Sequence, residues 1–159
     1  MPEQLSLESA EETEATGSRL AEKILAVAPD SICIYLQGEL GAGKTTFARG
    51  FLRGCGHAGR VPSPTYTLVE PYECGSYQVI HMDLYRLKDG AELEFLGIND
   101  MTESRSIQLI EWPERGAGGL TPADLQVFLK VIPEGRAFEL QAGTLLGAKV
   151  LQQWPRVNA

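Results

Sequence analysis

A glycine-rich segment, residues 38–45, has the residue types and the spacing of a phosphate-binding loop, because it matches the pattern GxxxxGK[ST]. Glycines let the backbone curl so that successive amide groups point at one anion, and the N-terminus of the following helix adds its positive dipole end. We expect the Lys44 ammonium to reach the β- and γ-phosphates, the Thr45 hydroxyl to ligate magnesium and Thr46 to donate to the α-phosphate. The other predicted nucleotide contacts come from the loop itself: Gly38, Glu39, Leu40, Gly41, Ala42 and Gly43.

Two acidic residues stand where a protein with such a loop needs a carboxylate for its metal ion or its water. Asp83 and Glu111 each follow directly on an apolar run, at 79–82 and 107–110. If these runs are strands beside the loop's strand, one acid can hold Mg²⁺ or its water shell and the other can orient the attacking water. The spacing does not decide which acid has which task, and capping a turn is the alternative for either one.

Four further residues each have two interpretations. Thr65 lies in a proline-rich segment after the loop's helix, where it either senses the γ-phosphate and metal or simply leads into a strand. Trp112 either packs as an anchor or places its ring near the nucleotide. We expect His81 to be a packed strand residue rather than a general base, and Arg136 to be a solvated turn residue.

The elements that must position these residues alternate between helices and strands. Ser9 and Glu12 form a capping box that begins a helix over 9–28, whereas residues 1–8 are expected to be flexible. A buried strand over 32–37 precedes the phosphate loop, and a helix over 44–53 follows it. Further strands are predicted over 66–72, 77–82, 106–110, 125–132 and 137–141, and further helices over 91–96 and 144–154. This alternation, with two hairpins, predicts an α/β fold. We expect one three-layer P-loop NTPase-like domain over 1–159, with a mixed, partly antiparallel central sheet.

The composition suits one soluble domain and limits its partners. The 159 residues are 43% hydrophobic, enough for a core that needs neither disulfide nor metal. Acidic residues outnumber basic ones 21 to 14, which argues against a protein that coats nucleic acid through a basic surface. Five glutamates and no basic residue lie in the first 18 positions, whereas residues 41–68 hold four basic residues and no acid. The pattern indicates one confined anion site.

Cysteine usage and hydropathy indicate the compartment. The three cysteines form no CxxC pair, and with only two histidines a structural zinc site is not expected. No apolar stretch approaches the roughly 20 residues that a transmembrane helix needs, and the first residues contain no apolar signal segment. We therefore expect a reduced, cytoplasmic protein without membrane contact.

Several longer segments together carry a family resemblance. With residues 38–47, they are Ser-Pro-Thr-Tyr-Thr-Leu-Val-Glu (63–70), His-Met-Asp-Leu-Tyr-Arg (81–86), Glu-Phe-Leu-Gly-Ile (94–98) and Glu-Trp-Pro-Glu (111–114). Over nearly its whole length the chain closely resembles the bacterial TsaE (YjeE) family. The resemblance implies a weak, Mg²⁺-dependent ATPase subunit of the machinery that makes threonylcarbamoyladenosine in tRNAs reading ANN codons. It also implies action on a TsaB–TsaD type heterodimer, the carbamoyl-transfer enzyme and its paralogue, so that tRNA is reached only through that complex.

The same resemblance implies roles for individual residues. It makes Asp83 and Glu111 the essential acids and favours Glu111 as the metal ligand. It places the adenine near the N-terminal segment, close to Leu7 and Thr13. Its other implied roles are phosphate binding for Lys44, magnesium binding for Thr45, a switch-like threonine at 65 and a place beside the nucleotide for Trp112.

Two other functions use the same fold. A small-molecule kinase on the P-loop fold would need an arginine-bearing lid and an acceptor pocket, yet Arg86, Arg105 and Arg115 are scattered along the chain. A nucleotide-sensing switch module would bind ATP without relevant hydrolysis, and the sequence does not separate it from an ATPase.

Overall fold

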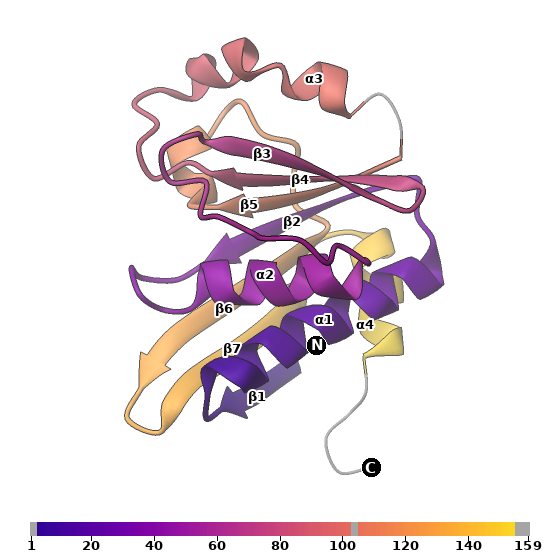
Figure 1. Cartoon of the computed structure of the whole chain (residues 1–159), viewed down its shortest axis with the longest axis vertical. Coiled ribbons are helices and arrows are strands. Elements are labelled where there is room, and N and C mark those ends of the chain that lie inside the picture. Colours follow the sequence, from indigo (N-terminus) through magenta and orange to yellow (C-terminus); the bar gives the residue numbers. More distant parts are fainter. Residues whose placement is uncertain (1–2, 103–104, 155–159) are drawn as a thin grey trace.

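A mixed seven-stranded sheet forms the centre of the molecule (Figure 1). The computed structural model describes residues 3–102 and 105–154. The strands are β1 (Glu3–Leu7), β2 (Ser31–Gln37), β3 (Val69–Cys74), β4 (Tyr77–Asp83), β5 (Ser106–Glu111), β6 (Leu125–Ile132) and β7 (Gly135–Ala142). Their order is β1-β7-β6-β2-β5-β4-β3, parallel from β6 to β4 and antiparallel at both edges. The predicted mixed sheet is confirmed.

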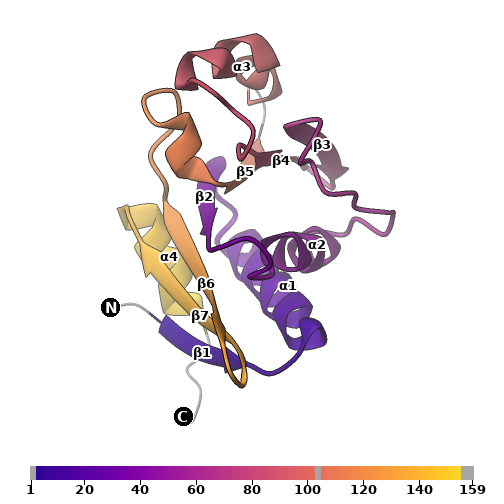
Figure 2. The ribbon, with the colours of Figure 1, turned by 90° about the vertical axis from the view of Figure 1, so that its left-hand side faces the viewer.

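Helices cover both faces of this sheet, which gives the three layers predicted (Figure 2). The elements are α1 (Ala10–Val27), α2 (Lys44–Gly54), α3 (Ile98–Met101) and α4 (Leu145–Gln153), with two 3₁₀ helices, η1 (Gly90–Leu96) and η2 (Pro113–Gly116). Side chains of β2 alternate between two hydrophobic clusters. Ile34 and Leu36 pack with α1, α2 and α4, whereas Cys33 packs on the face covered by η1, α3 and η2. Both faces of β2 are buried because helical segments cover the parallel part of the sheet on each side.

The helix that begins near residue 9 has the predicted capping contacts. Ser9 is the N-cap, and its side chain accepts a hydrogen bond from the Glu12 amide at 3.2 Å. The Glu12 carboxylate in turn accepts one from the Glu8 amide at 2.6 Å. These contacts satisfy amides that an uncapped helix would leave without partners. Glycines then let α1 lie against α2, because a Cβ at Gly50 would collide with the Glu14 carbonyl.

Two expectations about the elements are wrong. Residues 3–7 are not flexible: they form β1, which pairs with β7 and places Leu5 opposite Phe138; residues 1–2 lie outside the described ranges. The strand predicted from residue 66 begins only at Val69. Residues 64–68 form a turn instead, closed by a 2.8 Å hydrogen bond from the Leu68 amide to the Pro64 carbonyl, and Leu68 has a φ of 67°. The short helix α3 was not predicted at all.

The remaining features agree with an ordinary globular core. The three cysteines are buried and free, and burial raises the pKa of Cys33 and Cys55 to about 12, so their thiols stay protonated. In the described part of the chain, no helix combines the length and the apolar character needed to cross a membrane.

Candidate functional site

The predicted loop and both acids meet at one edge of the sheet. Strands β2, β5 and β4 are parallel neighbours, so their carboxyl ends lie side by side, and Glu111 is in register with both Leu36 and Asp83. The loop leaves the end of β2 and enters α2 at Lys44, with φ values of 78° at Gly41 and 103° at Gly43 that favour glycine. A pocket of about 270 Å³ lies among them. Its lining residues are Leu40, Gly41, Ala42, Gly43, Lys44, Thr45, Thr46, Thr65, Asp83, Glu111 and Trp112.

The Lys44 ammonium is folded back over its own loop. It donates to the carbonyl oxygens of Gly38 and Glu39, the latter at 3.1 Å, and lies 4.0 Å from the centre of the Trp112 ring. Burial lowers the pKa of Lys44, and the charges of nearby carboxylates, Glu111 foremost, partly offset that effect. A cation held mainly by neutral groups in a buried place is suited to an anionic ligand.

Thr45, Glu111 and Asp83 form the corner where a metal ion would fit. Thr45 Oγ1 lies 3.5 Å from Glu111 Oε2, and the two acids are register partners on β4 and β5. Burial raises the pKa of Asp83, and the neighbouring charge of Glu111 raises it further. A divalent cation would relieve the repulsion between these two carboxylates.

The donor set suits magnesium bound together with phosphate. Among the described residues, no three or more His, Cys, Asp and Glu side chains gather as a metal site of their own. Mg²⁺ is usually held by one or two carboxylates plus substrate phosphates and water, and the hydroxyl of Thr45 completes such a set. The residues present therefore fit Mg²⁺ carried in with a nucleotide better than a permanently bound metal.

Thr65 and Trp112 both reach the pocket. The Thr65 hydroxyl donates to Asp83 Oδ2 at 3.2 Å and lies 2.7 Å from Ser63 Oγ, so the structure brings Thr65 to one of the two predicted acids. The other Asp83 oxygen accepts from the Tyr85 amide at 3.0 Å. The ring of Trp112 packs 4.9 Å from that of Tyr85 and also lines the pocket, so this geometry does not choose between its two interpretations.

A second pocket of about 260 Å³ lies on the other side of the loop. Gly41, Gly43 and Thr46 line both pockets, and the start of α1 and the β6–β7 turn form the remaining wall. Leu7 and Thr13 line this second pocket, so the structure brings both residues to the loop. The two hollows together could hold an extended ligand whose phosphates lie in the first one.

Arg136 is not a solvated turn residue. Its guanidinium donates from Nε to the Ala42 carbonyl and from Nη2 to the Gly41 carbonyl, both at 3.1 Å. The sequence carries no signal for this contact, because it arises only when the β6–β7 hairpin folds over the loop. His81 is buried in β4 as expected, but it also contacts the site, with Nε2 2.6 Å from Glu111 Oε2. The sequence offered one signal for this contact: His81 stands two positions before the predicted acid Asp83, so both side chains lie on one face of the strand.

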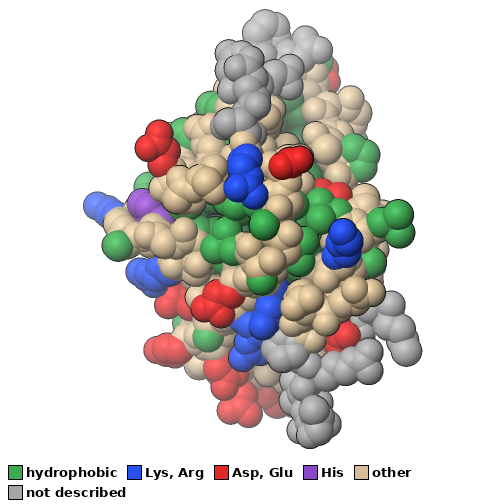
Figure 3. Space-filling model, turned by 90° about the vertical axis from the view of Figure 1, so that its right-hand side faces the viewer, with side chains coloured by type: hydrophobic (Ala, Val, Ile, Leu, Met, Phe, Trp, Pro, Cys, Tyr) green, Lys and Arg blue, Asp and Glu red, His purple; other side chains and the backbone are tan. Residues whose placement is uncertain are grey.

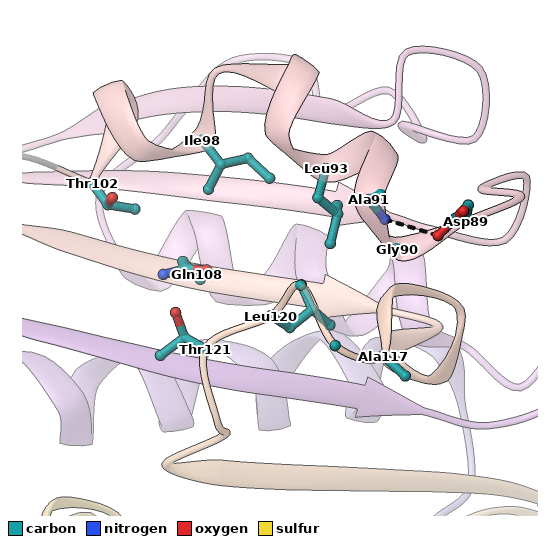
Figure 4. Close-up of a pocket in the computed structure, with 12 residues that line it drawn as sticks. Asp89, Gly90, Ala91, Leu93, Ile98, Thr102, Gln108, Ala117, Leu120 and Thr121 are labelled. Atoms are coloured by element: carbon teal, nitrogen blue, oxygen red, sulfur yellow. Dashed lines mark hydrogen bonds between the residues drawn. The ribbon is translucent and has the colours of Figure 1, made fainter.

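A larger cavity, about 710 Å³, lies elsewhere (Figure 4). It is bounded by η1, α3, the 117–121 segment and Gln108 of β5, and it shares no lining residue with the two pockets at the loop. None of the predicted site residues lines it, whereas Ile98, from the segment 94–98 that carries the family resemblance, does.

Comparisons with known proteins agree on one family. A family model described as "Threonylcarbamoyl adenosine biosynthesis protein TsaE" matches residues 7–137. The chain is similar to the tRNA threonylcarbamoyladenosine biosynthesis protein TsaE of Haemophilus influenzae, with 48% identity over 136 residues, 85% of this chain and 86% of that protein. The protein of the same name from Bacillus subtilis is 38% identical over 120 residues, 76% of this chain and 72% of that one. The crystal structure of Bacillus subtilis YdiB superimposes with a TM-score of 0.74 at 27% identity, covering 96% of this chain and 95% of that chain.

Proposed function

Because this chain belongs to the TsaE family of threonylcarbamoyl adenosine biosynthesis proteins, we propose that it binds and hydrolyses Mg²⁺–ATP as a subunit of the machinery that makes threonylcarbamoyladenosine in tRNA. One observation carries the proposal: Lys44, Thr45, Asp83 and Glu111 converge on one pocket at the carboxyl edge of the sheet. That edge is where ligands bind in open α/β sheets.

The residues divide the chemistry of phosphoryl transfer among themselves. Lys44 leaves the loop carbonyls and pairs with the β- and γ-phosphates, while the loop amides hold the phosphate oxygens. Thr45 and Glu111 hold Mg²⁺, which when bound neutralises charge on the phosphates. Asp83 orients the attacking water, since Thr65 and the Tyr85 amide fix the orientation of its carboxylate. The raised pKa of Asp83 makes that carboxylate a better proton acceptor.

The adenosine part of ATP fits the second pocket, beside Leu7 and Thr13. This assignment is supported by geometry, because the phosphate pocket and the second pocket share Gly41, Gly43 and Thr46. An ATP molecule can thus follow the loop from one hollow to the other.

Slow hydrolysis without a partner follows from what the pocket contains. No arginine is among the residues that line the 270 Å³ pocket in the described part of the chain. An arginine beside the transferring phosphoryl group is worth about 10³–10⁵ in rate when a partner supplies it. We propose that a TsaB–TsaD type heterodimer completes or rearranges this site, and that hydrolysis acts on that heterodimer.

In this proposal the protein works in the cytoplasm, where tRNA is modified, and it reaches tRNA only through its partner proteins. The formal charge of −7 does not favour phosphate-backbone binding. On the face shown in Figure 3, basic side chains are separated by acidic and hydrophobic ones and form no continuous patch.

The test compares ATP turnover alone and with the purified heterodimer. The proposal expects slow turnover alone, stimulation by the heterodimer, and loss of turnover in Lys44→Met and Asp83→Asn, with Lys149→Ala on the exposed face of α4 as the charge control. Fast hydrolysis that ignores the heterodimer would contradict the proposal. Stimulation retained by Asp83→Asn would show that this acid is not needed.

The kinase alternative has less support. It needs an acceptor pocket beside the γ-phosphate, but the cavity of about 710 Å³ (Figure 4) and those of about 480 and 310 Å³ share no residue with the phosphate pocket. The switch alternative predicts full function from a variant that binds ATP and does not hydrolyse it, so Glu111→Gln and Asp83→Asn tested for tRNA modification with the complete machinery would separate it from an ATPase.

A further inference from the structure

His81 is a fully buried polar residue in direct contact with the proposed metal site. It lies on β4, and its Nε2 is 2.6 Å from Glu111 Oε2, whereas its buried Nδ1 has no partner among the described residues. Nε2 therefore carries the proton and donates it to the carboxylate, because a proton on Nδ1 would find no acceptor. The contact has a defined direction, from the ring to the acid.

The sheet register makes this contact possible. His81 is opposite Leu109, and Asp83 is opposite Glu111. His81 and Glu111 are thus diagonal neighbours on one face of adjacent parallel strands, within reach of a long side chain. That face is the one covered by α2, which begins at Lys44.

Glu111 needs such a contact to keep one orientation. Its carboxylate lies beside the like charge of Asp83, and Thr45 approaches it only at 3.5 Å. The hydrogen bond from His81 is the one short side-chain contact to Glu111 in the described part of the chain. It engages Oε2, and no side chain among the described residues is seen to donate a hydrogen bond to the second oxygen of the carboxylate.

We propose that His81 is a positioning residue: it holds the Glu111 carboxylate in the orientation required to bind Mg²⁺ together with Thr45. This inference rests on the proposed function, because the metal in question is the Mg²⁺ of Mg²⁺–ATP. Groups that orient metal ligands in this way typically change metal affinity by about 10–100-fold when removed. A role limited to filling the core predicts no selective effect on the metal.

The experiment measures metal binding directly, without turnover. Mn²⁺ replaces Mg²⁺, and electron paramagnetic resonance gives the affinity of Mn²⁺ for the protein–ADP complex; calorimetry with EDTA gives the affinity for metal-free ADP. The variants are His81→Leu, which removes the donor, and His81→Gln, whose amide nitrogen can take the place of Nε2. His57→Leu, at the other histidine of the chain, is the matched control.

We expect His81→Leu to weaken Mn²⁺ binding about tenfold or more and to leave the affinity for metal-free ADP within about twofold of the wild type. His81→Gln should keep most of the Mn²⁺ affinity that His81→Leu loses. If His81→Leu does not fold, the Mn²⁺ affinities of His81→Gln and His81→Asn are compared instead. The shorter asparagine amide cannot reach Glu111 Oε2, so His81→Asn should bind Mn²⁺ more weakly than His81→Gln. Equal Mn²⁺ affinity in all variants, or a parallel loss of metal-free ADP binding, would overturn the inference.

The wild-type protein separates this inference from the function on which it rests. If the wild type binds neither ADP nor Mn²⁺–ADP, the proposed function is wrong. If it binds Mn²⁺–ADP tightly and His81→Leu does the same, only the role of His81 is wrong.

Discussion

Arg136 makes two hydrogen bonds that fasten the phosphate loop to the β6–β7 hairpin, and removing them should weaken nucleotide binding. Both bonds run from a charged donor to backbone carbonyls, at 3.1 Å to Ala42 and 3.1 Å to Gly41. Hydrogen bonds from charged groups contribute about 1.5–3 kcal/mol each to stability. The bond to Ala42 is part-buried and the bond to Gly41 is exposed, so we take the lower value for the first and less for the second, about 2 kcal/mol in total.

The loss of this free energy should lower the nucleotide affinity, because the loop must be ordered to bind phosphate. Without the two Arg136 hydrogen bonds, which we call the Arg136 clamp, the nucleotide-free loop occupies other conformations. Nucleotide binding must then restore the conformation that binds phosphate. At 1.4 kcal/mol per factor of ten, about 2 kcal/mol corresponds to a roughly 30-fold rise in the Kd for ADP. Arg136→Met removes the donors and keeps an unbranched side chain of comparable reach.

Calorimetric titration of ADP into Arg136→Met, Arg136→Lys and Arg60→Met measures the effect. Lysine keeps the charge but lacks the planar fork that serves two carbonyls at once, so Arg136→Lys should lose most of the affinity as well. Arg60→Met, at an exposed arginine, should match the wild type. Wild-type affinity in Arg136→Lys would show that only the positive charge at position 136 matters. Wild-type affinity in Arg136→Met would refute the idea that the Arg136 hydrogen bonds support nucleotide binding.

Three further predictions follow from the same geometry. Lys44→Met should abolish ADP binding by calorimetry while changing the free energy of unfolding by less than about 1 kcal/mol, because burial already disfavours the charged ammonium and lowers its pKa; a large loss of stability would contradict this. Burial raises the pKa of Asp83 above its ordinary value of 3.8, so the folded protein binds this proton more tightly than the unfolded chain does. The stability of the nucleotide-free protein should therefore fall as the pH rises from about 3.8 through the folded-state pKa, and urea denaturation of Asp83→Asn should show a flatter profile; an unchanged profile would mean that Asp83 is not perturbed. Gly50→Ala should lower the free energy of unfolding by roughly 1–3 kcal/mol, because the added Cβ collides with the Glu14 carbonyl. The gain in helix propensity, about 1 kcal/mol, does not offset this collision. Urea denaturation measures the change, and a stabilised variant would refute the close contact of α1 and α2.

Local patterns predicted most of the elements, because their signals lie within a few residues of one another. The capping contacts of Ser9 and Glu12, the buried strand before the loop and the β6–β7 hairpin are examples. The errors have two causes: a partner distant in the chain, and a local turn that the sequence pattern did not indicate. β1 exists because β7 offers it an edge, and the segment at Tyr66 turns away because residues 64–68 close a turn before β3 begins.

The site divides in the same way. The sequence alone indicated the phosphate loop and the two strand-end acids and predicted a shared purpose for them, since the chemistry needs those residue types at those spacings. It also implied, through the family resemblance, that Leu7 and Thr13 lie close to the adenine, which stays a prediction. What the sequence could not determine is how the acids are held. Parallel pairing of β4 with β5 puts Asp83 beside Glu111 and His81 diagonal to it, and the folding of one hairpin brings Arg136 to the loop. Those contacts join residues far apart in the chain, and their distances and burial, which set charge and affinity, exist only after the sheet has formed.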